Sequence, residues 1–526
     1  MLYDIAVVGS GFAGSLVAMI ARRLGLSVAL IEKGTHPRVV IGESSTPLAN
    51  LLIEELSARY SLDSIRPLAK WGSWQRTYPK VACGLKRGFT FHHHLLDSSL
   101  PPDPNRADQL LVAASPHNEI ADMHWYRADF DAFLMEEATK SGVEYFDRTE
   151  LTTFEDNGRE VCMRGERDGR AVEFHARFAV DATGPRGFLH QALGLGELFL
   201  PNFPATESLY SHFTGVDRLG ASEFSRSDAE PPYPIDDAAV HHVFDGGWIW
   251  VLKFNNGITS AGVAATNDFA AEMRFSEGAA AWHRVLDRIP ALKLQFAHAR
   301  AQRAFTHMPR LAFRSATISG ERWALLPSAA GFVDPLLSTG FPHTLLGVAR
   351  IAKIIEDHWG KVSFTAQLKD YAAKTDEELL AAARLIGALY ANMNRFDVFV
   401  ALSLLYFAAA SYAEAARRLG KPHLAPSFLL CTHPEFGAAC ERICEQARRK
   451  LSNAEAAGLI EQINAAIEPF NIAGLGRPER RNWYPAEASD ILNAASKLES
   501  GRNEVEALLA RCGFICESPS SVAATS

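Results

Sequence analysis

The chain has 526 residues, of which 48% are hydrophobic and 22% are charged, a composition typical of a folded globular protein with two or three packed units. Its net charge of −8 argues against a nucleic-acid-binding surface, which would need an excess of basic residues. The seven cysteines are few and odd in number, and no C-x-x-C pair occurs, so we expect neither a disulfide framework nor a structural zinc site. These features favour a reducing, cytoplasmic environment and predict no bound metal.

No segment predicts export or a membrane span. The N-terminus, MLYDIAVVGSGFAGS, is apolar but lacks the basic start of a signal peptide. The most apolar later run is VFVALSLLYFAAASYA from Val398, which is shorter than the roughly 20 residues that cross a bilayer. We interpret this run as a buried helix of a helical domain.

Residues 3–35 predict a βαβ unit, which founds a parallel sheet. YDIAVVG indicates a buried strand, SLVAMIARRLG a helix and SVALIEKG a second buried strand. Between the first strand and the helix lies a G-x-G-x-x-G sequence, which in this context predicts a dinucleotide-binding turn. Its glycines allow a tight bend, a close approach of a pyrophosphate and close packing of helix on strand. The predicted cofactor contacts are Gly9, Gly11, Phe12, Ala13 and Gly14 in the turn, and Glu32 and Lys33 at the end of the second strand.

The middle of the chain predicts a second, mostly antiparallel sheet. Residues 205–317 alternate short strand-like segments with turns, and Asn255-Asn256-Gly257 between two such segments indicates a β-hairpin. The pattern of a buried strand followed by glycine returns at RWALLPSAAGFVDP, so this sheet is inserted into the nucleotide-binding domain. After about residue 361 the sequence predicts helices nearly to its end.

Three later segments resemble those of FAD-dependent monooxygenases and their relatives, in the same order along the chain. They are HWYRADFDAFL at 124–134, FAVDATGPRG at 178–187 and RWALLPSAAGFVDP at 322–335. The resemblance implies FAD as the cofactor, with Arg127, Asp181 and Ser328 among its contacts. Pro327-Ser328 replaces the family's usual Gly-Asp, so Ser328 offers at most a weaker hydrogen bond to the ribityl chain.

No second G-x-G-x-x-G sequence occurs on a strand of its own, so a built-in NAD(P)H domain is not expected. Electrons then come from the substrate, from a transiently bound nicotinamide or from a separate reductase. The predicted fold class is α/β. A discontinuous Rossmann-type FAD-binding domain is expected from 1–82, 105–204 and 318–360, a substrate-binding sheet from 83–104 and 205–317, and a helical region from 361–526.

Two loops narrow the resemblance to flavin-dependent halogenases. GFVDPLLSTG matches the F-x-x-P-x-x-S-x-G pattern of that family through Phe332, Pro335, Ser338 and Gly340, and GESSTP at 42–47 matches its flavin-covering loop through Glu43 and Ser44. The resemblance implies that Thr339 and Gly340 hold a halide, and consecutive backbone N–H groups in a tight turn do form anion sites. The alternative is a plain flavin-contacting loop.

Lys86 is the candidate catalytic amine. Lys86-Arg87-Gly88-Phe89-Thr90-Phe91 matches the K-x-G-x-x-F segment around the catalytic lysine of halogenases that act on phenols and pyrroles. In that family, reduced flavin and oxygen convert halide to hypohalous acid, which a lysine then positions beside the substrate. A positioned proton donor of this kind contributes roughly 10²–10⁴-fold to a rate. The alternative is a strand-edge lysine that extends into water.

The family's W-x-W-x-I-P segment is altered here. Trp248 and Trp250 are present, but Lys253 replaces the proline. On a strand the two tryptophans share one face and form a wall that the resemblance places between substrate and flavin. Leu337 stands where tryptophan-specific halogenases carry a glutamate, which favours a phenol, pyrrole or similar ring as substrate.

The adjacent histidines at 92–94 suggest a metal site, but the pattern opposes it, and His241 and His242 are expected to flank the second sheet. On a strand His92 and His94 share a face while His93 lies on the other, so the three cannot form a compact ligand set. We interpret these histidines as cleft-lining or solvated, and one of His241 and His242 as a candidate for the substrate pocket.

The sequence thus predicts a halogenase of an electron-rich aromatic substrate, free or carrier-tethered. It would use reduced FAD from a separate flavin reductase, oxygen, and chloride or bromide, with Lys86 and Ser338 as catalytic residues. Two alternatives use the same scaffold: a hydroxylase, and a dehydrogenase or reductase. A flavin-binding protein without activity is a third. The helical region either caps the substrate chamber or docks a carrier protein.

Overall fold

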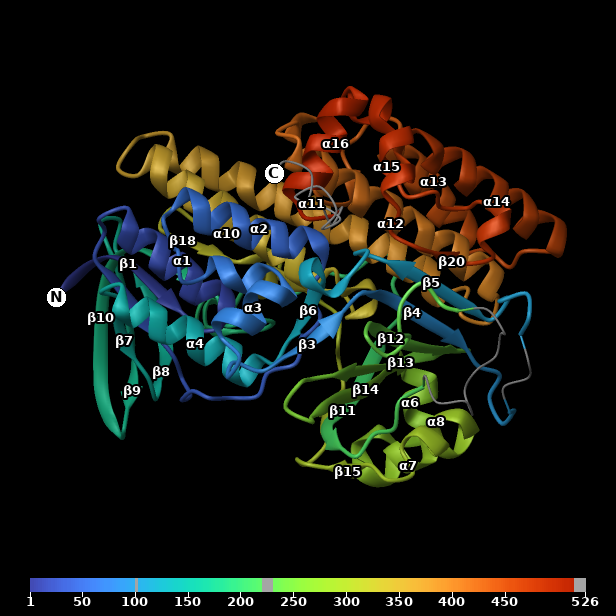
Figure 1. Ribbon diagram of the computed structural model, residues 1–526. Helices are drawn as coiled ribbons and strands as arrows, with labels where there is room; N and C mark the ends of the chain where they lie inside the picture. Colours follow the sequence, from blue (N-terminus) through green and yellow to red (C-terminus); the bar gives the residue numbers. More distant parts are fainter. Residues whose placement is uncertain (100–102, 220–229, 515–526) are drawn as a thin grey trace, which may run out of the picture.

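The computed structural model describes residues 1–99, 103–219 and 230–514. Figure 1 shows two sheet-containing parts side by side, with a layer of helices from the last third of the chain across both. This arrangement has the predicted α/β class.

The first sheet is built on the predicted βαβ unit. β1 (Leu2–Val8) and β2 (Val28–Ile31) pair in parallel, and α1 (Phe12–Arg23) connects them. The strand order is β7-β2-β1-β10-β9-β8, and β18 also pairs with β10. β10 and β18 continue the parallel part, whereas β8, β9 and β10 form an antiparallel extension. These strands are β7 (Glu144–Phe146), β8 (Thr149–Asp156), β9 (Val161–Arg167), β10 (Arg170–Asp181) and β18 (Trp323–Leu325).

The second sheet is mostly antiparallel, as expected. Its order is β15-β11-β14-β13-β12-β4-β5-β20, with β16 beside β11, and only the β12–β4 and β20–β5 pairs are parallel. The predicted hairpin is confirmed, because β13 and β14 are joined through a turn in which Gly257 has a φ of 80°. The strands are β4 (Gly88–His93), β5 (Gln109–Ala113), β11 (Thr206–Thr214), β12 (Ala239–Phe244), β13 (Gly247–Lys253), β14 (Thr259–Thr266), β15 (Arg300–Ala301), β16 (Thr306–Met308) and β20 (Trp483–Tyr484).

The segments that build this sheet come from more of the chain than the inserted region alone. β5 falls in the segment 105–204 that was assigned to the FAD-binding domain, and β20 falls in the helical region. β5 pairs with the side of β4 that is not paired with β12, and β20 pairs with the other side of β5 at the end of the sheet. Two short ladders complete the strands: β3 (Cys83–Lys86) with β6 (Asp122–Trp125), and β17 (Phe313–Arg314) with β19 (Gly331–Phe332).

Helices after residue 361 form the predicted helical region. They are α11 (Phe364–Tyr390), α12 (Phe396–Arg418), α13 (Phe436–Ala447), α14 (Asn453–Ile467), α15 (Ala488–Asn493) and α16 (Arg502–Arg511). The earlier helices are α2 (Pro47–Arg59), α3 (Trp71–Thr77), α4 (Arg127–Lys140), α5 (Phe188–Ala192), α6 (Asn267–Met273), α7 (Ala279–Arg288), α8 (Pro290–Gln295), α9 (Pro327–Ala330) and α10 (Gly340–His358).

The helix α12 contains the apolar run that begins at Val398. In the described part of the chain it alone is long and apolar enough to cross a membrane, and 83% of its most apolar window is buried. It packs against β4 of the second sheet, where Phe399 meets Phe91 at 5.9 Å and Phe407 meets Phe89 at 5.2 Å between ring centroids. Its apolar residues therefore form part of the protein core.

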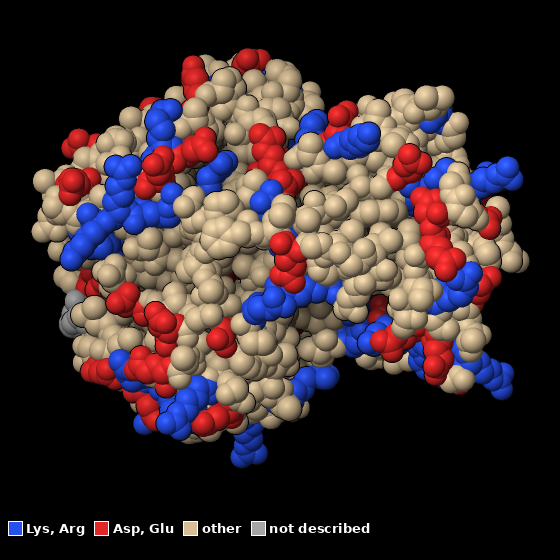
Figure 2. Space-filling view, turned by 180° about the vertical axis from the view of Figure 1, so that it is seen from behind, with Lys and Arg blue, Asp and Glu red and all other residues tan. Residues whose placement is uncertain are grey.

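The side of the molecule opposite to Figure 1 carries both signs of charge. Figure 2 shows Lys and Arg interspersed with Asp and Glu over this face, between broad areas of other residues. Charges mixed in this way produce no single-sign field across this face.

Candidate active site

A cavity of about 460 Å³ lies where the first sheet, the second sheet and α10 meet. It brings together most of the residues that the sequence motifs predicted. The predicted residues that line it are Gly11, Phe12, Ala13, Glu43, Ser44, Arg127, Trp248, Trp250, Ser328, Phe332, Pro335, Ser338, Thr339 and Gly340. Five further predicted cofactor residues, Gly9, Gly14, Glu32, Lys33 and Asp181, lie outside the lining, and so does Lys86.

The glycine turn at the start of α1 is tight for steric reasons. Gly9 has a φ of 99°, and a Cβ there would lie 2.7 Å from the carbonyl carbon of Ala182. A Cβ on Gly14 would lie 1.9 Å from the Gly9 carbonyl oxygen, so the helix packs against the turn without a side chain between them. The first-turn N–H groups of α1 face the cavity, which suits a phosphate group.

Glu32 and Lys33 differ in where they lie. The Glu32 carboxylate accepts hydrogen bonds from the Ser10 backbone N–H at 2.9 Å and from the Ser10 hydroxyl at 3.0 Å, and it pairs with Arg38 at 3.2 Å. Glu32 does not line the cavity, and it stabilises the glycine turn through these bonds to Ser10. Lys33 is largely exposed and pairs with Glu150 at 2.6 Å, away from the cavity.

Arg127 connects α4 to the flavin-covering loop that the sequence predicted at residues 42–47. Its guanidinium donates to both carboxylate oxygens of Asp131, at 2.8 and 2.7 Å, and to the Gly42 carbonyl at 3.0 Å. The next residue, Glu43, is buried and pairs with buried His212 of β11 at 2.9 Å. These contacts attach the loop to α4 and to β11 of the second sheet.

Asp181 serves the turn that follows β10. Its carboxylate accepts hydrogen bonds from the Thr183 N–H and hydroxyl, at 2.8 and 2.5 Å, and from the Leu189 N–H at 2.6 Å. Burial raises the pKa of this carboxyl. The neighbouring residues 182–185, rather than Asp181 itself, line the cavity.

The loop before α10 is bent into an unusual shape. Leu337 and Ser338 both have positive φ angles, 64° and 55°, a conformation that L-residues rarely adopt. Thr339 and Gly340 follow directly at the start of α10, whose first-turn N–H groups have no acceptor inside the helix. The helix dipole adds positive potential at the same point, so the turn suits a small anion.

Asp334 of this loop is buried and accepts hydrogen bonds from three different residues. Its carboxylate accepts hydrogen bonds from the Trp248 indole N–H at 3.1 Å, from the Tyr390 hydroxyl at 2.8 Å and from the Leu336 N–H at 2.9 Å. Burial raises the pKa of the Asp334 carboxyl to about 7. The loop is thereby attached to β13 of the second sheet and to α11.

The tryptophan wall is present on β13. Trp248 and Trp250 lie with ring centroids 5.7 Å apart, and Leu252 continues the same face along the cavity. Lys253 lies outside the lining, and its ammonium donates to the carbonyls of Val216 and Asp217 at 2.7 and 3.0 Å. The residue that replaces the family's proline is therefore turned away from the wall.

Lys86 ends β3 and is completely buried. Its ammonium donates to the Ser44 hydroxyl at 2.9 Å and to the Ser45 carbonyl at 2.5 Å, and it lies 3.8 Å from the centroid of the Phe89 ring. Burial lowers the pKa of Lys86, and the negative charge of Asp122 opposes this shift. Because Ser44 lines the cavity, the amine sits directly behind the cavity wall.

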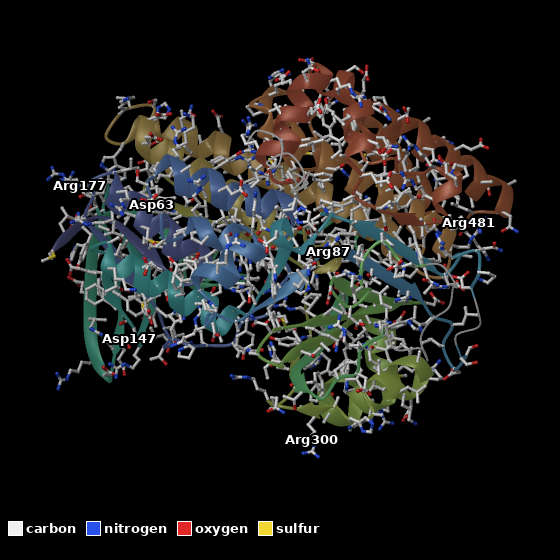
Figure 3. The ribbon with its side chains drawn as sticks, viewed as in Figure 1. Asp63, Arg87, Asp147, Arg177, Arg300 and Arg481 are labelled. Atoms are coloured by element: carbon white, nitrogen blue, oxygen red, sulfur yellow. The ribbon has the colours of Figure 1, made fainter. Side chains whose placement is uncertain are left out.

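Arg87, the other basic residue of this segment, faces a different way. It donates to the carbonyls of Ser115 and Pro116 and to the Asn118 amide oxygen. Figure 3 places it at the junction of the two sheet-containing parts. Arg87 lies between the end of β3 and the start of β4, and of the two basic residues it is Lys86 that contacts the loop around Ser44.

Aromatic rings fill the space between Lys86 and the tryptophan wall. His241 of β12 lines the cavity and stacks on Phe91 at 4.4 Å between centroids, and it lies 5.2 Å from Trp248. Burial and the nearby Lys86 lower the pKa of His241 to about 3, so this ring is neutral. His241 is thus the member of the 241–242 pair that reaches the pocket.

The remaining histidines lie deeper in the second sheet. His94 and His242 are joined by a hydrogen bond of 2.9 Å between ring nitrogens.

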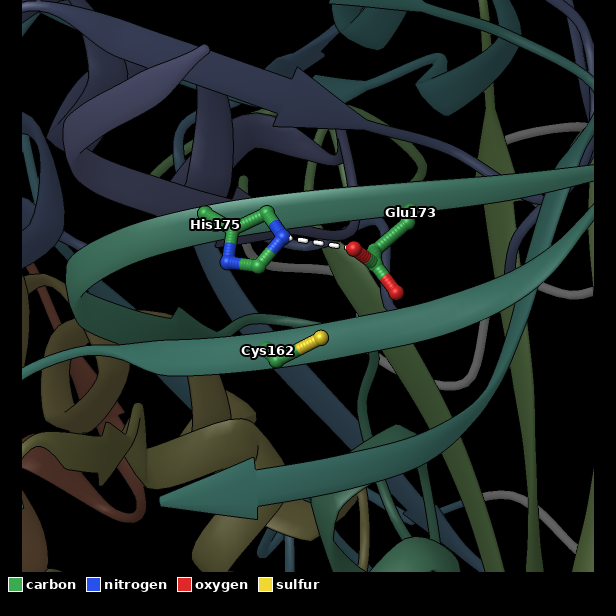
Figure 4. Close-up of side chains that lie close together, drawn as sticks. All are labelled: Cys162, Glu173 and His175. Atoms are coloured by element: carbon green, nitrogen blue, oxygen red, sulfur yellow. Dashed lines mark hydrogen bonds and ion pairs between the residues drawn. The ribbon is translucent and has the colours of Figure 1, made fainter. Parts of the chain in front are cut away.

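Within residues 1–99, 103–219 and 230–514, one group alone has three potential metal ligands within reach of one another: Cys162, Glu173 and His175 on β9 and β10 (Figure 4). Hydrogen bonds from His175 and Arg164 lower the pKa of Glu173 to about 2, so its carboxylate is already engaged.

The residues around the cavity fit FAD. The glycine turn leaves room for close backbone contact, and the N-termini of α1 and α10 offer N–H groups to anions. Apolar side chains such as Phe12, Trp250 and Leu311 supply most of the remaining surface for a flat ring system. FAD would be held by the turn at residues 9–14, the loop at residues 42–47 and the loop before α10.

Several residues of this site gave no signal in the sequence. Tyr390, His212, Asp122 and Asn50 lie in no recognisable motif. Asp334 stands inside GFVDPLLSTG, but its partners come from distant parts of the chain. Only the three-dimensional arrangement brings these side chains to the site.

Comparison with known proteins places the chain among flavoenzymes. A family model described as tryptophan halogenase matches residues 104–400, and a model described as FAD binding domain matches residues 2–199. The tetracycline 7-halogenase of Kitasatospora aureofaciens is 32% identical over 359 residues, which cover 65% of this chain and 61% of that protein, less than two thirds of its length. The 1H-pyrrole-2-carbonyl-[peptidyl-carrier protein] chlorinase of Pseudomonas fluorescens is 27% identical over 380 residues, 69% of this chain and 79% of that protein.

A solved structure has the same fold over most of both chains. The halogenase PltM in complex with phloroglucinol and FAD superposes with a TM-score of 0.81 at 23% identity, covering 91% of this chain and 99% of PltM. At this identity the likeness concerns the fold.

Proposed function

This chain belongs to the flavin-dependent halogenase family, because the family model matches more than half of it, and we propose that it halogenates an electron-rich aromatic ring. FAD is its cofactor. When reduced, FAD supplies two electrons and two protons, which together with one further proton convert oxygen and a halide to hypohalous acid and water. In the second step the hypohalous acid transfers its halogen to a ring carbon, the ring loses a proton, and water is released.

The burial of Lys86 directly behind the cavity wall is the observation that carries this proposal. A buried ammonium that already donates to Ser44 can donate in the same way to the oxygen of hypohalous acid. Such a hydrogen bond makes that oxygen a better leaving group and fixes the halogen near the substrate. The complete burial of Lys86 argues against the alternative, in which it is a strand-edge lysine that extends into water.

The turn before α10 supports a halide site beside the flavin. Thr339 and Gly340 present backbone N–H groups at a helix N-terminus, and Ser338 shapes the turn through its positive φ. We propose that chloride or bromide binds there. The wall of Trp248 and Trp250 would keep the aromatic substrate away from the flavin, and His241 lies beside Trp248 with ring centroids 5.2 Å apart.

The substrate is proposed to be a phenol or a pyrrole. The chain carries Leu337, fully buried, where tryptophan-specific relatives carry a glutamate. Relatives act on a tetracycline and on a pyrrole bound to a carrier protein, so both a free and a tethered substrate fit the proposal. A separate flavin reductase, sharing a cytoplasmic location with this protein, would supply the reduced FAD.

A turnover assay tests the proposal. The protein is incubated with FAD, a flavin reductase, NADH, oxygen and chloride or bromide, together with a panel of free phenols and pyrroles and a carrier-bound pyrrole. Mass spectrometry then detects a halogen on the product. Lys86→Met should abolish halogenation while flavin oxidation continues, and Lys140→Met, which changes an exposed lysine paired with Glu137, should leave halogenation intact. If the protein instead inserts oxygen into the substrate, at a rate that depends neither on the halide nor on Lys86, it is a hydroxylase.

A further inference from the structure

Asp122 lies directly opposite Lys86 in the short β3–β6 ladder. The two are registered partners in an antiparallel pair, so their side chains leave the same face with Cβ atoms roughly 5 Å apart. Both are buried, Lys86 completely and Asp122 to 95%. A buried acid beside a buried amine is costly unless each compensates the other.

A short network orients the Asp122 carboxylate. The Asn50 side-chain N–H of α2 donates to Asp122 Oδ1 at 2.7 Å, and the Ser45 hydroxyl donates to the Asn50 amide oxygen at 3.2 Å. The Ser45 carbonyl in turn accepts from Lys86 at 2.5 Å. Asp122 and Lys86 are thus connected through two residues that belong to the flavin-covering loop and the helix after it.

One of the two carboxylate oxygens of Asp122 makes no hydrogen bond within the part of the chain that the structure describes. This oxygen, Oδ2, is buried. Burial raises the pKa of the Asp122 carboxyl, and the positive charge of Lys86 opposes this shift more strongly than any other group does.

We propose that Asp122 is a positioning residue for Lys86: its carboxylate is the counter-ion that keeps the buried amine protonated and directed at Ser44. The catalytic consequence rests on the proposed function, since only a protonated Lys86 donates a hydrogen bond to hypohalous acid.

The surroundings of the pair leave Asp122 as the main source of negative charge. The titratable groups that face Lys86 or Asp122 are His124 on β6, His241 on β12, and Tyr406, Glu414 and Arg418 on α12. Burial lowers the pKa of both histidines to about 3, and burial raises the pKa of Tyr406, so these three groups are neutral. Glu414 pairs with Arg418 at 2.7 Å, and their charges offset each other.

The experiment measures the protonation of Lys86 directly. Protein labelled with ε-¹³C lysine is titrated by NMR, and the Lys86 resonance is identified by its absence from Lys86→Met. In Asp122→Asn, which keeps the shape and removes the charge, we expect the midpoint of Lys86 to fall by at least about one pH unit. Asp103→Asn, a matched change of a buried acid that caps the turn at residues 107–108, should leave the midpoint unchanged.

An unchanged or higher midpoint in Asp122→Asn overturns the proposal. If that variant does not fold, Asn50→Ala decides in the same way, because loss of its hydrogen bond makes the Asp122 charge less stable and should lower the Lys86 midpoint. In the turnover assay, Asp122→Asn should lower kcat for halogenation at least about tenfold, with KM for the aromatic substrate unchanged and the alkaline limb of the pH profile moved to lower pH.

The NMR titration needs no turnover, so the two proposals can fail separately. A shifted Lys86 midpoint without halogenation by the wild-type protein would leave the pairing intact and remove the halogenase function. Halogenation that depends on Lys86, with no shift in Asp122→Asn, would do the reverse.

Discussion

The indole N–H of Trp248 donates a hydrogen bond of 3.1 Å to the buried carboxylate of Asp334, which joins the tryptophan wall to the loop that starts α10. One side of this contact belongs to β13 of the second sheet and the other to the loop with the candidate halide turn. The wall that would separate substrate from flavin and the turn that would hold the halide are therefore directly connected.

Trp248→Phe should loosen this connection. The change keeps most of the aromatic surface but leaves Asp334 Oδ1 with the Leu336 N–H as its remaining donor. Loss of one hydrogen bond costs about 0.5–1.5 kcal/mol of folding free energy. We expect a higher KM for halide and more flavin oxidation without halogenation. Urea unfolding and halide-dependent turnover measure the two effects.

Trp250→Phe is the matched control, since the Trp250 indole donates only to the neutral Ser260 hydroxyl at 3.3 Å. It should leave the KM for halide near that of the wild type. Equal effects of the two changes on this KM would show that the link to Asp334 has no role.

Asp334 should make the protein less stable as pH rises from acid to neutral. Burial raises its pKa from the ordinary 3.8 to about 7, so the folded protein binds a proton that the unfolded chain has released. The stability that this proton contributes is fully present below about pH 4 and is lost as pH rises through about 7. Unfolding by urea at a series of pH values measures the slope.

Asp334→Asn removes this titration and keeps an acceptor for Trp248. The difference in unfolding free energy between the two proteins should therefore change between pH 4 and pH 7 and be constant on either side. A difference that is the same at every pH would show that Asp334 titrates at its ordinary value.

The sequence was most informative where a single local pattern determines the structure. The βαβ unit, the hairpin at Asn255-Gly257 and the buried helix from Val398 were all predicted, because hydrophobic period and turn residues specify them locally. The strand β5 and the two-residue strand β20 were not placed, since their pairing is decided by which sheet edge is left open.

The candidate site shows the same division. Motifs identified the loops around Ser44 and Ser338, and these do line the cavity. Asp122 could not be found, because nothing in DMHW shows that β6 pairs with β3 and brings this acid beside Lys86. Lys33 was named for its place after Glu32, but it lies beyond the end of β2, where its side chain is exposed and pairs with Glu150.

Gly14→Ala should prevent FAD binding. A Cβ at this position would lie 1.9 Å from the Gly9 carbonyl oxygen, so either the helix α1 or the turn at residues 9–11 must move. We expect the purified variant to lose the visible absorption of bound FAD. Gly458→Ala is the control: it lies in α14, nothing lies within 4 Å of its added Cβ, and it should gain about 0.5–1 kcal/mol of helix stability with FAD retained. Retention of FAD by Gly14→Ala would mean that this glycine is not needed for the cofactor turn.

Lys253→Ala should leave the ratio of halogenated to oxygenated product unchanged. Its ammonium binds the carbonyls of Val216 and Asp217 and does not line the cavity, so the replacement of the family's proline does not reach the tryptophan wall. Loss of two hydrogen bonds should cost about 1–3 kcal/mol of stability, visible as a lower urea midpoint. Mass spectrometry of the products decides the point. A rise in oxygenated product would show that the end of β13 controls access to the flavin after all.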